Sequence, residues 1–150
     1  MVSCPTIHHP INMSPTQTVH YFFNCIIAKD VEGICASYIP DDQTYVVLEG
    51  PRLTTLGYTK IAKGWADFCA SDLSLRAIEW LEGPFEESSA DMAWLAGIIR
   101  LRVHLRERDF EQTFRASFVL RNNAKGWQIR HEHVSGALTD PYGIGDWLKS

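Results

Sequence analysis

Apolar residues recur every three to four positions in the first third of the chain, which predicts helices there. The segment Ser14-Pro15-Thr16-Gln17 has the features of a capping box, with a capping serine, a proline at the first helical position and a glutamine three residues after the cap. A helix is therefore predicted to begin there and to run to about Lys29. Its buried stripe consists of Val19, Phe22, Phe23, Ile26 and Ile27. Asp30 is expected to cap a second, short helix that ends at Pro40.

A strand and a third helix are predicted next. The run Gln43–Glu49 is rich in β-branched and aromatic residues, and Gly50-Pro51 breaks it. Gly57 is placed to open a helix whose wide apolar face is formed by Ile61, Trp65, Phe68 and Cys69.

The second half of the chain changes to the pattern of strands, predicted at residues 75–82, 92–106, 110–121 and 127–135. Turns are expected at Gly83-Pro84, at residues 107–109 and at residues 122–126. The run from 92 to 106 is too long for a flat strand, so a bulge or kink is expected at Gly97. Helices followed by long strands indicate an α+β fold, with helices on one face of an antiparallel sheet. We expect a single domain over residues 1–150, with residues 1–13 and 136–150 as irregular tails.

Charge and composition narrow the class of protein. The chain has 150 residues, a net charge of −4 and a pI near 5.8, so neither nucleic acid nor an anionic membrane is an expected partner. There is no predicted secretory signal or membrane-spanning run, which favours the cytoplasm. The cysteines are expected to be free thiols: Cys4, Cys25, Cys35 and Cys69.

Two histidines near the end of the last predicted strand are the best candidates for chemistry. Uninterrupted alternation along a strand puts one set of residues on a single face: Trp127, Ile129, His131, His133 and Ser135. Two imidazoles beside apolar residues on a core-facing row suggest a pocket that a polar group enters. His131 and His133 lack a third metal ligand, so we expect neither a metal nor another cofactor. An alternative for each imidazole is a hydrogen bond that only shapes the pocket wall.

The order of elements, together with short motifs, resembles the SnoaL-like branch of the superfamily of nuclear transport factor 2 and ketosteroid isomerase. The motifs are Arg115-x-Ser117, Arg121, Gly126-Trp127 and His131-x-His133-x-Ser135. The segment 127–136 is also similar to the end of the association domain of calcium/calmodulin-dependent kinase II. The resemblance implies a cystatin-like, nuclear transport factor 2-like cone, in which a curved antiparallel sheet wraps three N-terminal helices around a deep pocket. It also implies homodimers that pair through the convex sheet face.

The resemblance further implies where side chains lie. It puts Arg115, Ser117, His131 and His133 on the concave wall, and Arg100 at a matching place on the neighbouring strand. Tyr45 and Trp65 become apolar wall, and Asp42 falls near where the family can have a carboxylate. The candidate catalytic residues are therefore His131, His133 and Asp42, and the candidate ligand-binding residues are Arg115, Arg100, Tyr45, Trp65 and Ser117.

One strand gives two opposite interpretations. Periodicity alone puts the row Phe114, Ala116, Phe118 and Leu120 in the core and Arg115 outside. The resemblance reverses this, making the row a convex dimer surface and turning Arg115 into the cone. We follow the resemblance in this prediction.

Three functions remain open. The first is a protein that binds a mostly apolar small molecule with an acidic or carbonyl group, held by Arg115, His131 and His133. The second is a metal-free cyclase, isomerase or dehydratase, with a histidine as general base next to a carbonyl. The third is an oligomerisation module that resembles the kinase association domain.

Overall fold

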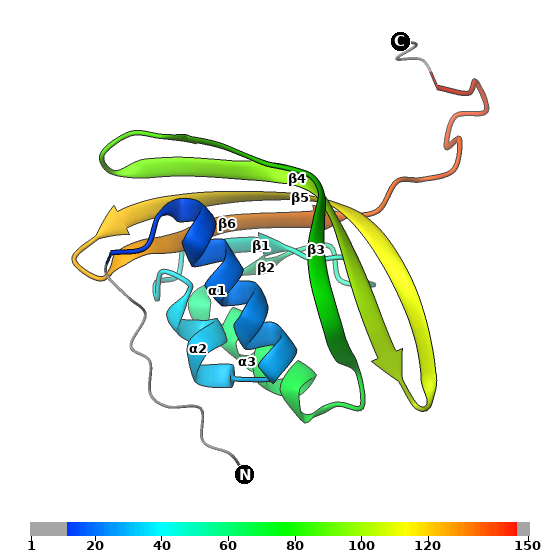
Figure 1. Cartoon of the computed structure of the whole chain (residues 1–150), viewed down its shortest axis with the longest axis horizontal. Coiled ribbons are helices and arrows are strands. Elements are labelled where there is room, and N and C mark those ends of the chain that lie inside the picture. Colours follow the sequence, from blue (N-terminus) through cyan, green and yellow to red (C-terminus); the bar gives the residue numbers. More distant parts are fainter. Residues whose placement is uncertain (1–11, 147–150) are drawn as a thin grey trace.

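The structure, a computed structural model that describes residues 12–146, is a strongly curved six-stranded sheet wrapped around helices on its concave side (Figure 1). The elements in chain order are α1 (Pro15–Ala28), α2 (Val31–Ala36), β1 (Tyr45–Val47), β2 (Thr55–Leu56), α3 (Tyr58–Ala70), β3 (Ser74–Ser88), β4 (Met92–Leu105), β5 (Arg108–Asn123) and β6 (Gly126–Ser135). The strand order is β2-β1-β6-β5-β4-β3. The predicted α+β cone is confirmed, and the sheet is antiparallel except where β1 runs parallel to β6.

The helix starts follow the chemistry predicted for them. Ser14 caps α1 through its side-chain oxygen, which accepts from the backbone N–H of Gln17, and the Gln17 side chain accepts in return from the Ser14 N–H. Asp30 caps α2 by accepting from the N–H of Gly33. None of the helices within residues 12–146 has the length and apolar character needed to span a bilayer.

Strand β3 departs from the prediction because it does not turn at Gly83-Pro84. It continues to Ser88, and the turn to β4 lies at residues 89–91. The extra residues of β3 are absorbed by register shifts between Leu75 and Ala77 and between Trp80 and Phe85. The bulges therefore lie in β3. They bring its backbone close to Gly97 of β4, where an added Cβ would lie 2.2 Å from the carbonyl oxygen of Glu82.

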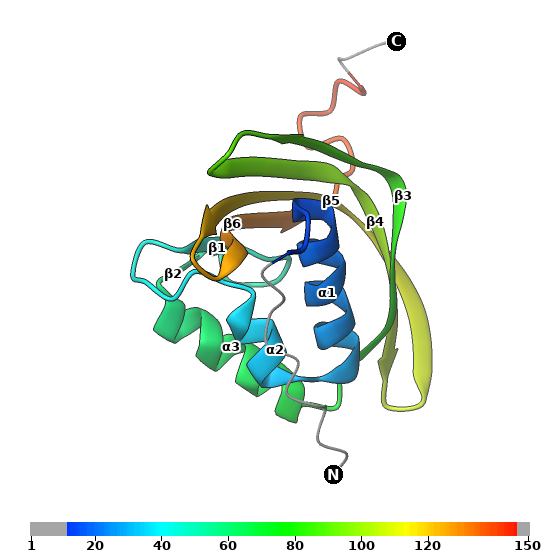
Figure 2. The same ribbon diagram turned by 60° about the vertical axis from the view of Figure 1, so that its left-hand side comes forward.

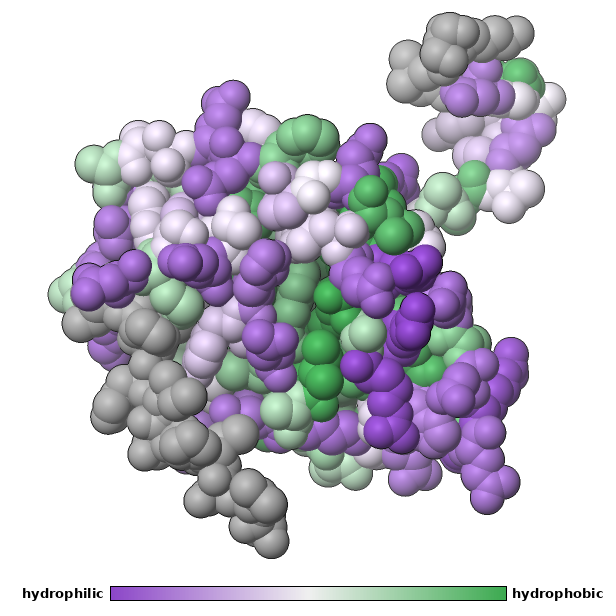
Figure 3. All heavy atoms as spheres, viewed as in Figure 1, coloured by the Kyte–Doolittle hydropathy of each residue, from purple (hydrophilic) through white to green (hydrophobic). Residues whose placement is uncertain are grey.

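The core lies between the concave face of the sheet and α1. Side views show α1 lying along the inside of the curve, with α2 and α3 closing the lower side (Figure 2). The most buried sheet residues alternate with exposed ones, and those on the inside are Ala93, Leu95, Ile99, Ala116, Phe118 and Leu120. The outer surface is largely hydrophilic in the view of Figure 3, with hydrophobic side chains gathered beside α1 and β3.

The row on β5 therefore faces the helices and not a partner. Ala116, Phe118 and Leu120 are buried in the core cluster, and Phe114 packs against it. The prediction that these four side chains form a convex dimer surface is wrong. Periodicity alone gives the correct face, because a long apolar row gains most by packing on the aromatic side chains of α1.

Candidate functional site

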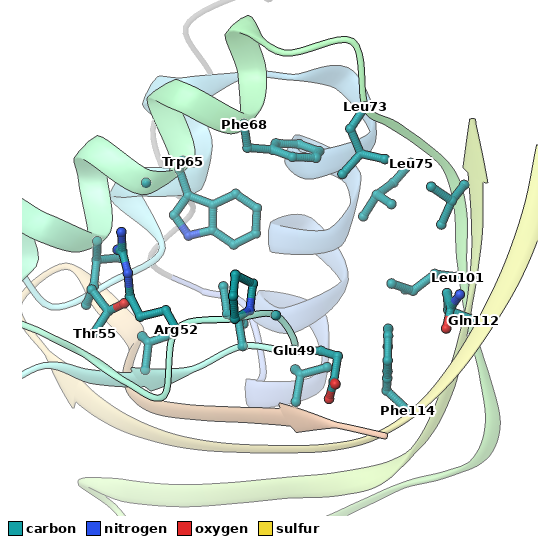
Figure 4. Close-up of a pocket in the computed structure, with 18 of the residues that line it drawn as sticks. Glu49, Arg52, Thr55, Trp65, Phe68, Leu73, Leu75, Leu101, Gln112 and Phe114 are labelled. Carbon is teal, nitrogen blue, oxygen red and sulfur yellow. The ribbon is translucent and has the colours of Figure 1, made fainter. Parts of the chain in front are cut away.

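A cavity of about 560 Å³ lies between α3, the loop from β1 to β2 and the lower ends of β3, β4 and β5. Its wall away from the β1–β2 loop is apolar except for Gln112 of β5. In Figure 4 the indole of Trp65 and the ring of Phe68 face Leu75, Leu101 and Phe114 across the space. A volume of this size accommodates a small organic ligand.

Polar side chains gather on one side of the cavity, along the loop that follows β1. Glu49, Arg52 and Thr55 come from this loop and from β2, and Lys60 comes from the first turn of α3. Arg52 and Lys60 are exposed while lining the cavity, so they lie at its mouth. No ion pair within residues 12–146 involves either cation. The mouth therefore offers two positive charges to an anionic group.

The carboxylate at the mouth is already engaged. Glu49 Oε2 accepts from the backbone N–H of Gly136 at 2.7 Å, and Arg115 Nη2 donates to the carbonyl oxygen of the same residue at 2.7 Å. These two contacts fix the chain where it leaves β6. Arg115 thus binds a backbone carbonyl from the outside and does not enter the cavity.

A β-bulge in β6 explains why the histidines also lie outside. Val119 of β5 lies opposite His131, whereas the next residue, Leu120, lies opposite Ile129, so Arg130 is the extra residue. Its guanidinium donates to Asp41 Oδ1 at 2.7 Å and holds the pKa of that carboxyl below its usual range.

The bulge shifts the alternation by one position. Before the bulge, Trp127 packs against the core and Ile129 is buried. After the bulge, Glu132 is the residue that points inward. His131 and His133 point outward, where the prediction had them on the concave wall. That prediction assumed unbroken alternation, which a bulge interrupts.

Tyr45 and His131 pair across β1 and β6 on the convex side, with ring centroids 5.6 Å apart and nearly parallel planes. Ser117 is exposed and lies opposite His133. The prediction that Tyr45, His131 and Ser117 lie on the cavity wall is therefore wrong, because all three lie on the convex side.

Arg100 and Asp42 do not enter the cavity either. Arg100 Nη2 donates to Glu79 Oε2 at 2.7 Å, and this contact lowers the pKa of Glu79. Asp42 is exposed in the loop before β1. Of the predicted site residues, Trp65 alone lines the cavity.

Behind the cavity wall lies a buried polar chain of Trp65, Tyr38 and Glu132. Trp65 Nε1 donates to the Tyr38 hydroxyl at 3.0 Å, and that hydroxyl donates to Glu132 Oε1 at 2.5 Å. Tyr38 is fully buried, and Glu132 is 2% exposed. Burial raises the pKa of Glu132 to about 7, although the hydrogen bond from Tyr38 opposes the rise. Burial also raises the pKa of Tyr38.

Sequence reasoning missed Tyr38 and Glu132 as site residues for two reasons. Glu132 lies between two histidines, so only knowledge of the bulge would turn it inward. Tyr38 reaches it because the segment after α2 pairs with β6: Ile39 N–H donates to Ile129 O, and Ile129 N–H donates to Ser37 O. For the cavity itself one signal was available in the sequence, because Gln112 interrupts the apolar row of β5 at a position that lines the cavity.

Within residues 12–146 no three histidine, cysteine, aspartate or glutamate side chains come together as a metal site. The expectation of a metal-free pocket stays a prediction.

Comparison with known proteins gives one family and many structures of the same fold. The SnoaL-like domain matches residues 16–139. No curated protein matches the chain.

Among solved structures, a nuclear transport factor 2-like superfamily protein from Salmonella enterica serovar Typhimurium is 19% identical, with a TM-score of 0.72 over 87% of this chain and 94% of the other. A ketosteroid isomerase-like protein from Erwinia carotovora atroseptica is 16% identical, with a TM-score of 0.68 over 83% and 94%. A candidate calcium/calmodulin-dependent protein kinase type II association domain from Thiobacillus denitrificans is 18% identical, with a TM-score of 0.68 over 86% and 99%. At these identities the likeness is one of fold.

Proposed function

Because this chain belongs to the family of SnoaL-like domains, we propose that it binds a small, mostly apolar molecule that carries an acidic or carbonyl group. The observation that carries the proposal is the cavity of about 560 Å³, with a mostly apolar wall and, at its mouth, two cations that form no ion pair with the described residues. In this proposal Arg52 and Lys60 hold the acidic group, a role that the sequence analysis assigned to Arg115. An apolar body leaves water when it enters the cavity, while its charged group stays at the mouth.

The test compares decanoate with 1-decanol by isothermal titration calorimetry. Replacing Arg52 and Lys60 together by methionine keeps much of the side-chain bulk and removes both charges. Decanoate should bind more weakly by roughly tenfold for each charged hydrogen bond removed, at ~1.5 kcal/mol apiece, whereas binding of 1-decanol should not change. Arg121→Met, at an exposed arginine outside the cavity, is the matched control. Equal binding of decanoate by the parent and the double variant would contradict the proposal, as would no binding by the parent.

The catalytic alternative, a cyclase, isomerase or dehydratase with a histidine base, has less support. His131 and His133 lie on the convex face and do not meet the cavity. A general base must lie within hydrogen-bond reach of the proton it removes.

We propose a homodimer through the convex sheet face, now with a different set of residues. The strand register aligns one row across four strands on this face: Tyr45, His131, Val119 and Trp94. Tyr45 and Trp94 are exposed aromatic residues. On these four strands the row carries no carboxylate, lysine or arginine, and it ends beside Glu87 of β3, which lies opposite Trp94. A two-fold axis near Tyr45 and His131 keeps the two Glu87 side chains apart. This proposed dimer is the part of the oligomerisation alternative that we retain.

A cytoplasmic location is part of the proposal, because Cys35 and Cys69 carry free thiols, which a reducing compartment maintains. Recovery of the native protein in a secreted fraction on cell fractionation would contradict it.

A further inference from the structure

The cavity wall contains one side chain whose polar atom is turned away from the cavity. Trp65 lines the space, yet its Nε1–H is committed to the Tyr38 hydroxyl, and Tyr38 is fully buried and does not line the cavity. Only the carbon surface of the indole is therefore left for a ligand. Figure 4 shows this ring forming the wall opposite Phe114 and Leu101.

The indole is held there by polar and aromatic contacts at once. The Phe22 ring meets both Tyr38 and Trp65 edge-on, with ring centroids 5.3 and 5.8 Å away. Phe68 meets the other side of Trp65 edge-on at 5.5 Å. The Tyr38 hydroxyl accepts from the indole because its own proton goes to Glu132. The indole N–H and the tyrosine O–H thus each have one acceptor, and Glu132 Oε1 serves as the acceptor at the end of the series.

Stability alone gives no reason for this arrangement. A carboxyl group inside the fold with no cation beside it is unfavourable, and an apolar side chain at position 132 would avoid that cost. What the carboxyl supplies is an acceptor for Tyr38. Without it the tyrosine proton would compete for other partners, and the direction of the indole N–H would no longer be determined.

We infer that Tyr38 and Glu132 are positioning residues that hold the Trp65 N–H away from the cavity, and that they thereby make its inner end selective for hydrocarbon over hydroxylated chains. The inference rests on the proposed function and extends it to the ligand's orientation. The apolar end lies against Trp65, and the acidic end lies at Arg52 and Lys60. A hydroxyl at the apolar end would give up its hydrogen bonds to water without gaining the indole as a donor.

The first test uses decanoate and 10-hydroxydecanoate, measured by calorimetry. Parent protein should bind decanoate at least tenfold more tightly. Trp65→Phe removes the N–H, and because that group does not face the ligand, both affinities should fall by the same factor, within twofold. A tenfold larger loss for 10-hydroxydecanoate would show that the N–H serves the ligand and would overturn the inference.

The second test breaks the polar chain at its centre. Tyr38→Phe leaves the indole N–H without its acceptor, so the preference for decanoate should shrink by fivefold or more as the N–H becomes available to the hydroxyl. Glu132→Gln retains a carbonyl oxygen that accepts from Tyr38, so its preference should stay within twofold of the parent's. In a protein that already carries Trp65→Phe, adding Tyr38→Phe should leave the ratio of the decanoate affinity to the 10-hydroxydecanoate affinity unchanged. An unchanged ratio in Tyr38→Phe, or the same change in both backgrounds, would contradict a positioning role.

A measurement without ligand separates this inference from the proposed function. In ¹⁵N-labelled protein the indole N–H of Trp65 is identified as the signal that disappears in Trp65→Phe. It should exchange with solvent slowly in the parent and in Glu132→Gln, and at least tenfold faster in Tyr38→Phe. Rapid exchange in the parent overturns the inference even if Tyr38→Phe does not fold. Slow exchange with no binding of either acid sustains the positioning of Trp65 and removes the ligand assignment and the proposed function.

Discussion

At the scale of single residues, a carboxyl group buried without a cation can stay in the fold at neutral pH by keeping its proton. Glu132 keeps its proton up to about neutral pH, since burial raises its pKa from 4.5 to about 7. The unfolded chain releases the same proton near the ordinary value. Between these two pH values the folded state binds more protons than the unfolded state, so the free energy of unfolding falls as pH rises through this window.

Glu132→Gln should remove this pH dependence. The interval from 4.5 to about 7, at about 1.4 kcal/mol per pH unit, amounts to roughly 3 kcal/mol of stability present at pH 4.5 and lost by pH 7. Urea denaturation at pH 5 and at pH 8 should therefore show the parent losing more stability than the variant as pH rises. Parallel losses in the two proteins would mean that Glu132 is ionised across the whole range.

The residues of the site were only partly predictable from sequence. Trp65 lines the cavity from the apolar face of α3 that its helical spacing predicted, whereas its role as ligand wall came from the resemblance and stays a prediction. His131, His133 and Arg115 were placed on the wrong side, in the first two cases because one inserted residue reversed the alternation. Arg52 could not be found by pattern, since a loop residue has no periodicity from which its direction follows. Lys60 was missed although it lies on α3, four and eight residues before the lining residues Gly64 and Phe68.

At the scale of secondary-structure elements, the close approach of β3 to β4 depends on a residue without a side chain. The bulged part of β3 presses on Gly97, where an added Cβ would lie 2.2 Å from a backbone carbonyl and 3.0 Å from the Trp80 ring. Strand β4 pairs with β5 on one side and β3 on the other, so the backbone at Gly97 has little room to move away from this carbonyl. Gly64 in α3 is the opposite case, because a Cβ there meets nothing within 4 Å.

The same substitution should therefore have opposite effects at these two glycines. Gly97→Ala should destabilise the protein by about 1–3 kcal/mol through overpacking. Gly64→Ala should stabilise it by about 0.5–1 kcal/mol, because alanine favours the helix and restricts the unfolded chain. Chemical denaturation with matched m-values measures both. A stable Gly97→Ala protein would mean that β3 shifts away easily.

Most of the elements could be predicted because their signals are local. The capping box at Ser14 and the cap at Asp30 lie in the sequence next to the helices that they start. The course of β3 past Gly83-Pro84 was missed, since a glycine-proline pair indicates a turn unless the partner strand is known. The two-residue strand β2 was also missed, because its pairing with β1 is set by the loop between them.

At the scale of the whole molecule, the sheet has two faces with different tasks. The concave face forms the core and the cavity wall. The convex face presents the row of Tyr45, His131, Val119 and Trp94 near the start of β4. Nearer the end of β4 the same face carries ion pairs among Arg100, Glu79, Arg102 and Glu111. We therefore expect the proposed ligand binding and the proposed subunit pairing to be altered by separate sets of substitutions.

Trp94→Glu should convert a dimer to a monomer. Each subunit would bring an unpaired carboxylate into the interface, whereas the folded monomer has room for a charge at this exposed position. Sedimentation velocity at micromolar concentration measures the change, and Ala66→Glu, on the exposed side of α3, controls for the added charge. A monomeric parent would contradict the interface, and so would a Trp94→Glu variant that remains a dimer.

The extra residue at Arg130 also bears on how relatives of this chain should be aligned. A relative without the bulge would match this sequence with a one-residue gap, and the side of the gap on which a polar residue falls decides its face. Moving the gap by a few columns would assign the same histidine to the cavity in one alignment and to the outer surface in another. Site residues in such relatives are therefore better transferred by their hydrogen-bonded neighbour on β5 than by their column, since strand pairing fixes the face.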